Sequence, residues 1–393
     1  MKRVLFIDNW SQGKRFVEPV VKEFQSNNYY CYYLHADSYY LNKTFKNLEK
    51  ITDLSYEDHD ISEYEDSLYL ALRKIKPNVI IFISIHGIFQ RWANFIAEVL
   101  EIPCCFFMHG IRIPSPRKMS NRSFFYIIKR ALFYHGQFFL FCKDLLRMRG
   151  VAPRMTSSLL RFYVELIFHN HRFTNSPKNN MGLNYRLMFV NSRKDIDYFR
   201  SNYPLSSTTE FIISGNVSAL EPAIRSFNIE CSKDYILFVS QPGLLDYDDY
   251  FRTIVFFNKL FKGTEFRFLF RPHPRDDKNF VAQLQNDDVL ISSDSSDIDF
   301  ARSCAAIGIN SAMLLGFIYL GMPIIQISDG VNPELCSMFE YKRSIYYNLN
   351  ATENQESIIE RLRDLVTCCP NVDGEKTPSR IIYEGIVNSN YIN

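Results

Sequence analysis

Two kinds of cysteine chemistry are missing from this sequence of 393 residues. Its nine cysteines are an odd number, and no two of them have the C-x-x-C spacing of a zinc ligand pair. Cys104 and Cys105 are adjacent, and so are Cys368 and Cys369. This arrangement suits neither a zinc cage nor the disulfide framework of a secreted protein. We therefore expect a protein of the reducing cytoplasm.

The sequence also has no hydrophobic run of the roughly 18 to 20 residues that a membrane-spanning helix needs. The nearest run, residues 78–89, is shorter and contains His86. The first ten residues, MKRVLFIDNW, hold a short apolar run that Asp8 interrupts, and they have no small-residue cleavage site. We read them as a first β-strand rather than a signal peptide, and we expect a protein that is soluble or peripheral to the inner face of the cell membrane.

Acidic residues are scarce in one segment. From Ile111 to Arg172 there are twelve lysines and arginines but only two acids, Asp144 and Glu165, so this segment carries +10 and the rest of the chain −8. Many phenylalanines and tyrosines lie among these cations, a composition typical of contact with a headgroup layer. We expect 112–172 to bind an anionic membrane surface or a lipid-linked acceptor, although an ordinary solvated helical face would have a similar composition. Nucleic acid is not expected, because no binding module accompanies the charge.

Outside this segment, short apolar runs alternate with amphipathic ones, which is typical of parallel sheets covered on both faces. We predict an α/β protein with two doubly wound, Rossmann-like domains facing a cleft. The first is 1–220, with a helical basic insertion at about 113–176, and the second is 221–393. The predicted strands lie within 3–8, 29–36, 78–84, 102–110, 186–190, 209–216, 235–242, 266–274, 289–293, 305–311 and 323–328. The predicted helices lie within 13–27, 65–77, 88–101, 191–204, 248–261, 312–320 and 355–367.

Polar residues and glycines follow the predicted strands directly, where ligands of parallel α/β sheets bind. These residues are His109–Gly110, Ser214–Gly215–Asn216, Ser240–Gln241, His273 and Asn310–Ser311.

The histidine in RPHP is the most constrained of them. Pro272 and Pro274 remove two backbone donors and restrict φ on either side of His273, so the imidazole is held in one direction at the end of a strand. Either Asn310 or Ser311 can cap the next helix, whose first N–H groups would accept an anion. A protonated His273 could then donate a charge-assisted hydrogen bond to a phosphate there. The simpler alternative is a histidine that only ends a strand.

These motifs carry a resemblance to a known class. The RPHP of 271–274, followed by GINSAMLLGFIYLGMP at 308–323, resembles the His-Pro and serine motifs of bacterial sialyltransferases and related capsule or lipooligosaccharide transferases of the GT-B fold. FMHG at 107–110 together with RPHP is also similar to CDP-glycerol glycerophosphotransferases. The resemblance implies transfer of a sugar from a nucleotide donor, CMP-linked first and UDP- or GDP-linked otherwise, to a surface polysaccharide or lipooligosaccharide. It also implies that 1–220 binds the acceptor and that 221–393 binds the nucleotide-sugar.

The resemblance also implies residue roles. His273 and Ser311 would contact the nucleotide phosphate, and the base on the acceptor would be Asp246 or Asp249, or His109 if the glycerophosphotransferase pattern holds. The tandem serine of some sialyltransferases is absent, since Ala312 follows Ser311. Acids at 246–249 are also typical of a solvated helix start.

The other predicted nucleotide or phosphate contacts are Arg271, Asn310, Gln241, Gly215 and Asp294. The Asp-x-Asp in SSDSSDID (292–299) elsewhere holds a metal, but a serine-rich surface loop is the preferred interpretation, with Asp294 accepting from a ribose hydroxyl. No metal and no cofactor is expected. The alternative functions are a CDP-glycerol-type transferase, a nucleotide-sugar 2-epimerase, and a glycan-binding scaffold without catalysis.

Overall fold

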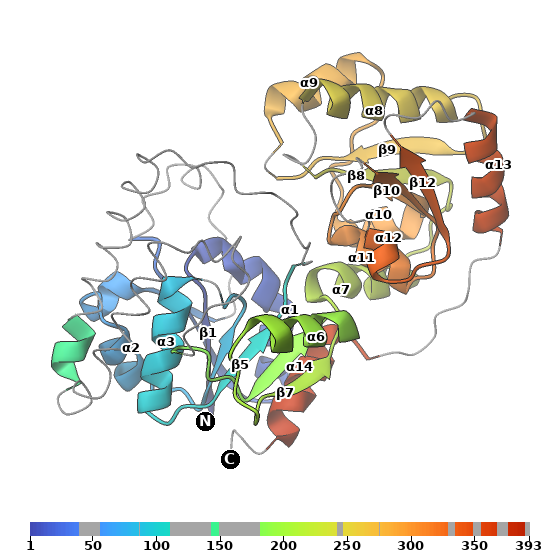
Figure 1. Cartoon of the computed structure of the whole chain (residues 1–393). Helices are drawn as coiled ribbons and strands as arrows, with labels where there is room; N and C mark the ends of the chain where they lie inside the picture. The colour runs from blue at the N-terminus through green and yellow to red at the C-terminus, as the bar shows by residue number, and fades with distance from the viewer. Residues whose placement is uncertain are drawn as a thin grey trace, which may run out of the picture. The chain divides into compact units, whose positions relative to one another are not determined.

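The computed structural model describes residues 1–38, 56–85, 87–110, 143–148, 181–241, 247–274, 276–328, 335–348, 355–367 and 376–389. Most of the basic segment 112–172 lies outside these residues, as do Asp246 and Arg275. The chain divides into two compact units (Figure 1). Among the described residues, the first unit contains Met1–His109, those from 143 to Gly215 and those from Pro378 onward. The second unit contains Gly110 and the residues from Asn216 to Thr377.

The first unit contains a seven-stranded parallel sheet in the order β3-β2-β1-β4-β5-β6-β7. Its strands are β1 (Arg3–Ile7), β2 (Tyr30–His35), β3 (Glu57–Asp60), β4 (Val79–Phe82), β5 (Cys104–Phe107), β6 (Leu187–Val190) and β7 (Glu210–Ile213). Every residue of β4, β5 and β6 is buried, which is expected of central strands covered on both faces.

Its longer helices are α1 (Lys14–Ser26), α2 (Leu68–Ile75), α3 (Ile88–Val99), α6 (Arg193–Asn202) and α14 (Pro378–Asn388). The last of these, α14, packs on α1 (Figure 1). The Phe24 and Tyr383 rings meet edge to face at 5.1 Å, and Arg380 lies 3.2 Å from the Glu23 carboxylate. Helix α14 is therefore part of the first unit, whereas the expected domain limits assign it to the second domain, 221–393.

The second unit contains a five-stranded parallel sheet in the order β12-β11-β10-β8-β9. Its strands are β8 (Tyr235–Val239), β9 (Arg267–Arg271), β10 (Ser303–Gly308), β11 (Ile324–Ser328) and β12 (Ser344–Asn348). Its helices are α7 (Val217–Arg225), α8 (Tyr247–Phe261), α9 (Lys278–Asn286), α10 (Ser296–Arg302), α11 (Met313–Tyr319), α12 (Leu335–Met338) and α13 (Gln355–Val366). Because β8 leads to β9 on one side and β10 lies on its other side, the strand order reverses at β8.

The predicted fold class of two doubly wound parallel sheets is confirmed. One predicted strand is wrong: residues 289–293 contribute only an isolated bridge between Ile291 and Phe270. Two strands are missing from the prediction: β3 (EDHD) has no apolar residue, and β12 (SIYYN) is an edge strand with one buried residue, Ile345. Within the described residues, no helix has the length and apolar composition needed to cross a membrane.

Candidate functional site

The carboxyl edge of the second sheet brings together most of the residues predicted to bind the nucleotide. Ser240 and Gln241 follow β8, His273 follows β9, and Asn310 and Ser311 follow β10. These three strands are adjacent in the sheet, with β8 in the middle. The edge where strand order reverses is the usual ligand site of such a sheet.

A chain of hydrogen bonds ties the ends of β8 and β9 together. The backbone amide of Gln241 donates to the hydroxyl of Tyr250 at 3.0 Å, and that hydroxyl donates to Ser240 Oγ at 2.7 Å. Ser240 Oγ donates to Asp276 Oδ2 at 2.5 Å, and the same oxygen accepts the backbone N–H of His273 at 2.6 Å. Burial raises the pKa of Tyr250, so its hydroxyl stays protonated and can donate. We call these five residues the loop bridge.

Sequence reasoning missed Asp276 and Tyr250. A signal for the first was present, because an aspartate three residues after His273 in HPRD is a common turn-forming position. The second gives no local signal, since Tyr250 lies on α8 among other apolar positions.

Arg271 already has a carboxylate partner. Its guanidinium is ion-paired with Asp299, whose side chain is 0% exposed, and it donates to Ser296 Oγ at 3.0 Å. Arg302 is also paired with Asp299, and it lies 2.7 Å from the Asp294 carboxylate. Arg271 and Asp294 thus belong to an internal ion network, which offsets the charge that Arg271 could offer a phosphate.

The side chain of Gln326, on β11, forms hydrogen bonds that stabilise the turn after β10. This buried side chain donates to the carbonyl of Ile309 and accepts from the amide of Cys336 at 3.1 Å. The next helix, α11, begins at Met313, and no side chain caps it from the preceding position. Ser311 Oγ accepts from the Met313 amide only at 3.4 Å. The expected helix cap is therefore weak, although Asn310 and Ser311 are both buried at the edge.

Two other predicted residues have simple structural explanations. Gly215 is the residue after which the chain passes from the first unit to Asn216 of the second, and it has a φ of 77°, a left-handed conformation that favours glycine. Asp249 lies exposed in the first turn of α8, with Arg252 at 4.0 Å, as expected of a solvated helix start.

In the first unit, His109 follows β5 and is oriented by a backbone contact. Its Nδ1 lies 2.7 Å from the carbonyl of Ile83, which can only accept, so Nδ1 carries the hydrogen and Nε2 is the unprotonated nitrogen of the neutral ring. The Phe16 ring lies 4.6 Å from the imidazole. Burial lowers the pKa of His109 below its ordinary 6.5, so the ring is neutral at pH 7. A neutral imidazole of this tautomer can accept a proton.

Asp8 is a buried carboxyl group at the same edge that sequence reasoning passed over. It follows β1, where the strand order of the first sheet reverses, and is 2% exposed. Its Oδ1 accepts from the amide of Asn9 at 2.8 Å and from Nε2 of Gln90 at 2.7 Å. Burial raises the pKa of Asp8 to about 7. The signal available in the sequence was a lone acid directly after the first apolar strand.

No protein-family model and no curated protein sequence matches this chain. Several solved structures do. UDP-GlcNAc 2-epimerase from Neisseria meningitidis bound to UDP-GlcNAc matches with a TM-score of 0.54 at 14% identity, over 98% of this chain and 100% of the other. The chain has the GT-B fold.

Two further structures with this fold are similar over their full lengths. UDP-GlcNAc 2-epimerase from Methanocaldococcus jannaschii has a TM-score of 0.52 at 14% identity, and 100% of each chain is covered. Phytolacca americana UGT2, complexed with UDP-2fluoro-glucose and pterostilbene, has a TM-score of 0.53 at 13% identity, again with 100% of each chain covered. At this identity the similarity establishes the fold only, and the reaction has to be inferred from the residues of the site.

Proposed function

We propose that this protein is a glycosyltransferase that moves a sugar from a nucleotide donor to a hydroxyl group of a surface polysaccharide or lipooligosaccharide. The observation that carries the proposal is the loop bridge, which holds Gln241 and His273 in one arrangement at the ligand edge of the second sheet. The donor class is supported by two matching GT-B structures, one bound to UDP-GlcNAc and one complexed with UDP-2fluoro-glucose. The preference for a cytidine donor comes from the RPHP motif.

On the donor side, we assign the leaving phosphate to His273 and Ser311. Departure of the nucleotide leaves negative charge on the phosphate oxygen that was bonded to the sugar. An imidazolium and nearby polar hydrogens can stabilise this charge without a metal ion. We assign Gln241 and Asn310 to further contacts with the nucleotide. Arg271 contributes through its place in the ion network with Asp299.

On the acceptor side, we assign the general base to His109. Its Nε2 takes the proton of the acceptor hydroxyl, the acceptor oxygen bonds to the anomeric carbon, and the bond from that carbon to the phosphate oxygen breaks. The neutral, oriented imidazole favours this assignment. Asp249 is exposed in a helix start, and Asp246 lies outside the described residues, so both remain alternatives.

A nucleotide-sugar 2-epimerase is the second candidate, because the matching structures from Neisseria meningitidis and Methanocaldococcus jannaschii have that activity in their names. The products distinguish the two functions. An epimerase converts UDP-GlcNAc to its 2-epimer with no acceptor present, whereas a transferase releases the nucleotide as the acceptor gains a sugar.

Contact with an anionic membrane through 112–172 and a cytoplasmic location remain part of the proposal. The segment lies largely outside the described residues, so its role rests on charge and composition.

A thermal-shift screen against CMP, CDP, UDP and GDP tests the proposed function. A nucleotide at a hundred times its Kd should stabilise the folded protein by about 2.7 kcal/mol. His273→Ala should weaken this stabilisation, while His59→Ala, a histidine change on β3 of the first unit, should not. If no nucleotide stabilises the folded protein, the proposed donor class is wrong.

A further inference from the structure

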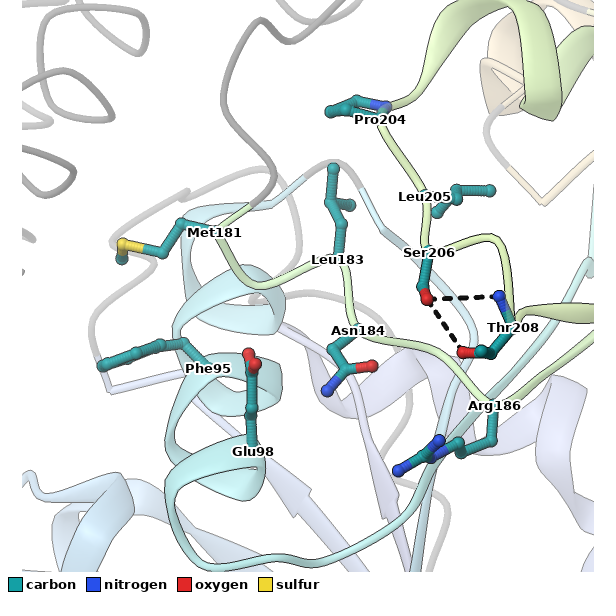
Figure 2. A pocket seen from close by; sticks show the side chains of 10 residues that line it. All are labelled: Phe95, Glu98, Met181, Leu183, Asn184, Arg186, Pro204, Leu205, Ser206 and Thr208. Atoms are coloured by element: carbon teal, nitrogen blue, oxygen red, sulfur yellow. Dashed lines mark hydrogen bonds between the residues drawn. The ribbon is translucent and has the colours of Figure 1, made fainter.

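The first unit has a hollow of about 520 Å³ (Figure 2). Three segments form it: the end of α3, residues 181–186 leading into β6, and residues 204–208 leading into β7. These segments lie at the amino ends of the strands, whereas the candidate acceptor site lies at the carboxyl ends. The hollow is therefore separate from the proposed reaction, and its size is ordinary for a small-molecule site.

The wall of the hollow is held in place by buried polar side chains of α3. Arg91 donates through Nε and Nη2 to the carbonyl of Met181, at 3.0 and 2.7 Å. The side chain of Asn94 both accepts from the amide of Asn184 at 2.9 Å and donates to its carbonyl at 3.1 Å. Gly182 has a φ of 67°, and a Cβ there would overlap the backbone of Arg91. The wall is thus preformed, because it cannot move without breaking buried hydrogen bonds.

Three polar side chains from this framework face the hollow. Figure 2 shows the amide of Asn184 between the Glu98 carboxylate and the Arg186 guanidinium in this view. Among the described residues, none of these three groups has a hydrogen bond or an ion pair within 4 Å. Desolvation raises the pKa of Glu98, and the positive charge of Arg186 opposes the rise, so the two charges act on one another without forming a pair.

The rest of the lining is apolar on one side and hydroxylated on the other. Phe95, Met181 and Leu183 border the hollow, but they are only 2 to 6% exposed because they pack in the core of the first unit. The hydroxyl of Ser206 binds both the amide and the hydroxyl of Thr208, at 3.2 and 2.8 Å, which fixes the opposite rim (Figure 2).

We propose that this hollow binds an acidic monosaccharide unit, one that carries a carboxylate and several hydroxyl groups. The guanidinium of Arg186 suits a carboxylate, with which it can form two parallel hydrogen bonds. The carboxylate of Glu98 and the amide of Asn184 suit adjacent sugar hydroxyls, which donate and accept in turn. Such a site would hold a glycan away from the reacting groups.

The test measures binding of free D-glucuronic acid and N-acetylneuraminic acid to the full chain by saturation-transfer NMR and calorimetry, with glucose as the neutral probe. Both acids should bind at least about tenfold more tightly than glucose, because a charge-assisted hydrogen bond is lost with the neutral sugar. Arg186→Gln should weaken binding of the acids by about tenfold or more. Glu98→Gln should have a smaller effect, since the amide can still accept from a hydroxyl.

Arg193→Gln is the matched control, because Arg193 is an exposed arginine at the start of α6 in the same unit. Arg186 is itself exposed, so thermal unfolding should be unchanged in both variants. Equal loss of binding in both variants would mean that only overall charge matters, and the proposal would fail. It would also fail if neither acid binds at about 10 mM, or if His109→Ala, rather than Arg186→Gln, removes the binding. Because the hollow is separate from the reaction, these results do not depend on the proposed transferase activity.

Discussion

The hydroxyl of Ser240 donates a 2.5 Å hydrogen bond to the carboxylate of Asp276, and this bond joins the ends of β8 and β9. Asp276 also accepts from the backbone of His273, so one carboxylate oxygen sets the distance between the two loops. A rigid arrangement of this kind reduces the ordering that a ligand must impose when it binds.

Asp276→Ala should therefore weaken nucleotide binding by about tenfold or more and lower the free energy of unfolding by about 2 kcal/mol, because two hydrogen bonds to a charged acceptor are lost. Calorimetry with the best nucleotide measures the first effect and urea unfolding the second. Asp276→Asn should recover part of both, since its amide oxygen can still accept. Asp277→Asn, at the neighbouring cap of α9, should resemble the wild type in both measurements. Unchanged nucleotide affinity in Asp276→Ala would show that the loop bridge does not organise the site.

His273→Ala should reduce turnover by roughly 10²-fold, because one group that stabilises charge on the leaving phosphate is removed. The side chain makes no part of the loop bridge, which uses the backbone N–H of His273, so circular dichroism should be unchanged. His59→Ala provides the control in the other unit. A well-folded His273→Ala enzyme with normal turnover would remove this residue from the mechanism.

His109→Ala should lower kcat by roughly 10²- to 10⁴-fold while leaving nucleotide affinity unchanged, because the proposed base contacts the acceptor. The pKa of His109 lies below 6.5 through burial, so the imidazole is the neutral base at neutral pH. Turnover in the wild type should stay constant from pH 8 down to about 6.5 and decline only at lower pH, as the ring gains a proton. A decline centred above pH 7 would point to a different base.

Asp8 should make the stability of the first unit depend on pH. Its pKa is 3.8 in the unfolded chain and about 7 in the fold, so the folded state holds the proton more tightly. The stabilisation from this proton is complete below pH 3.8, declines as pH rises, and is lost above about pH 7. Asp8→Asn cannot ionise, so its stability relative to the wild type should increase by up to roughly 1.4 kcal/mol per pH unit between pH 5 and 7.

Urea unfolding followed by tryptophan fluorescence measures this difference. Both tryptophans of the chain, Trp10 and Trp92, belong to the first unit, so their emission reports on the unit that contains Asp8. Parallel stability curves for the variant and the wild type would contradict the raised pKa.

Asp144 should anchor the described part of the basic insertion to the first unit. Its carboxylate accepts from Trp92 Nε1 at 3.0 Å, from the hydroxyl of Ser67, and from the amide of Leu68 at 3.3 Å at the start of α2. Asp144→Ala leaves these buried donors without an acceptor and should cost about 3 kcal/mol of unfolding free energy. Lys143→Ala, at the exposed neighbouring position, should cost less than about 0.5 kcal/mol. A small loss for Asp144→Ala would mean that water replaces the carboxylate.

The sequence by itself was sufficient for the doubly wound fold and for the edges that carry the candidate site. Continuous apolar runs such as 235–239 are typical of strands that helices cover on both faces of a parallel sheet. The polar residues that follow such a run therefore lie at the carboxyl end of the strand. His109, His273 and Asn310 were predicted in this way. These signals are local, because burial pattern and turn chemistry depend on neighbouring residues.

Only the tertiary structure decided which distant residues meet. Asp276 and Ser240 are 36 positions apart, Asp144 and Ser67 are 77 apart, and α14 returns to α1 from the other end of the chain. The partner of Arg271 was undetermined for the same reason, since Asp299 was one of several nearby acids. A buried polar group must find a partner, but its own neighbours in the sequence do not specify which one; the packing of whole strands and helices brings that partner within hydrogen-bonding distance.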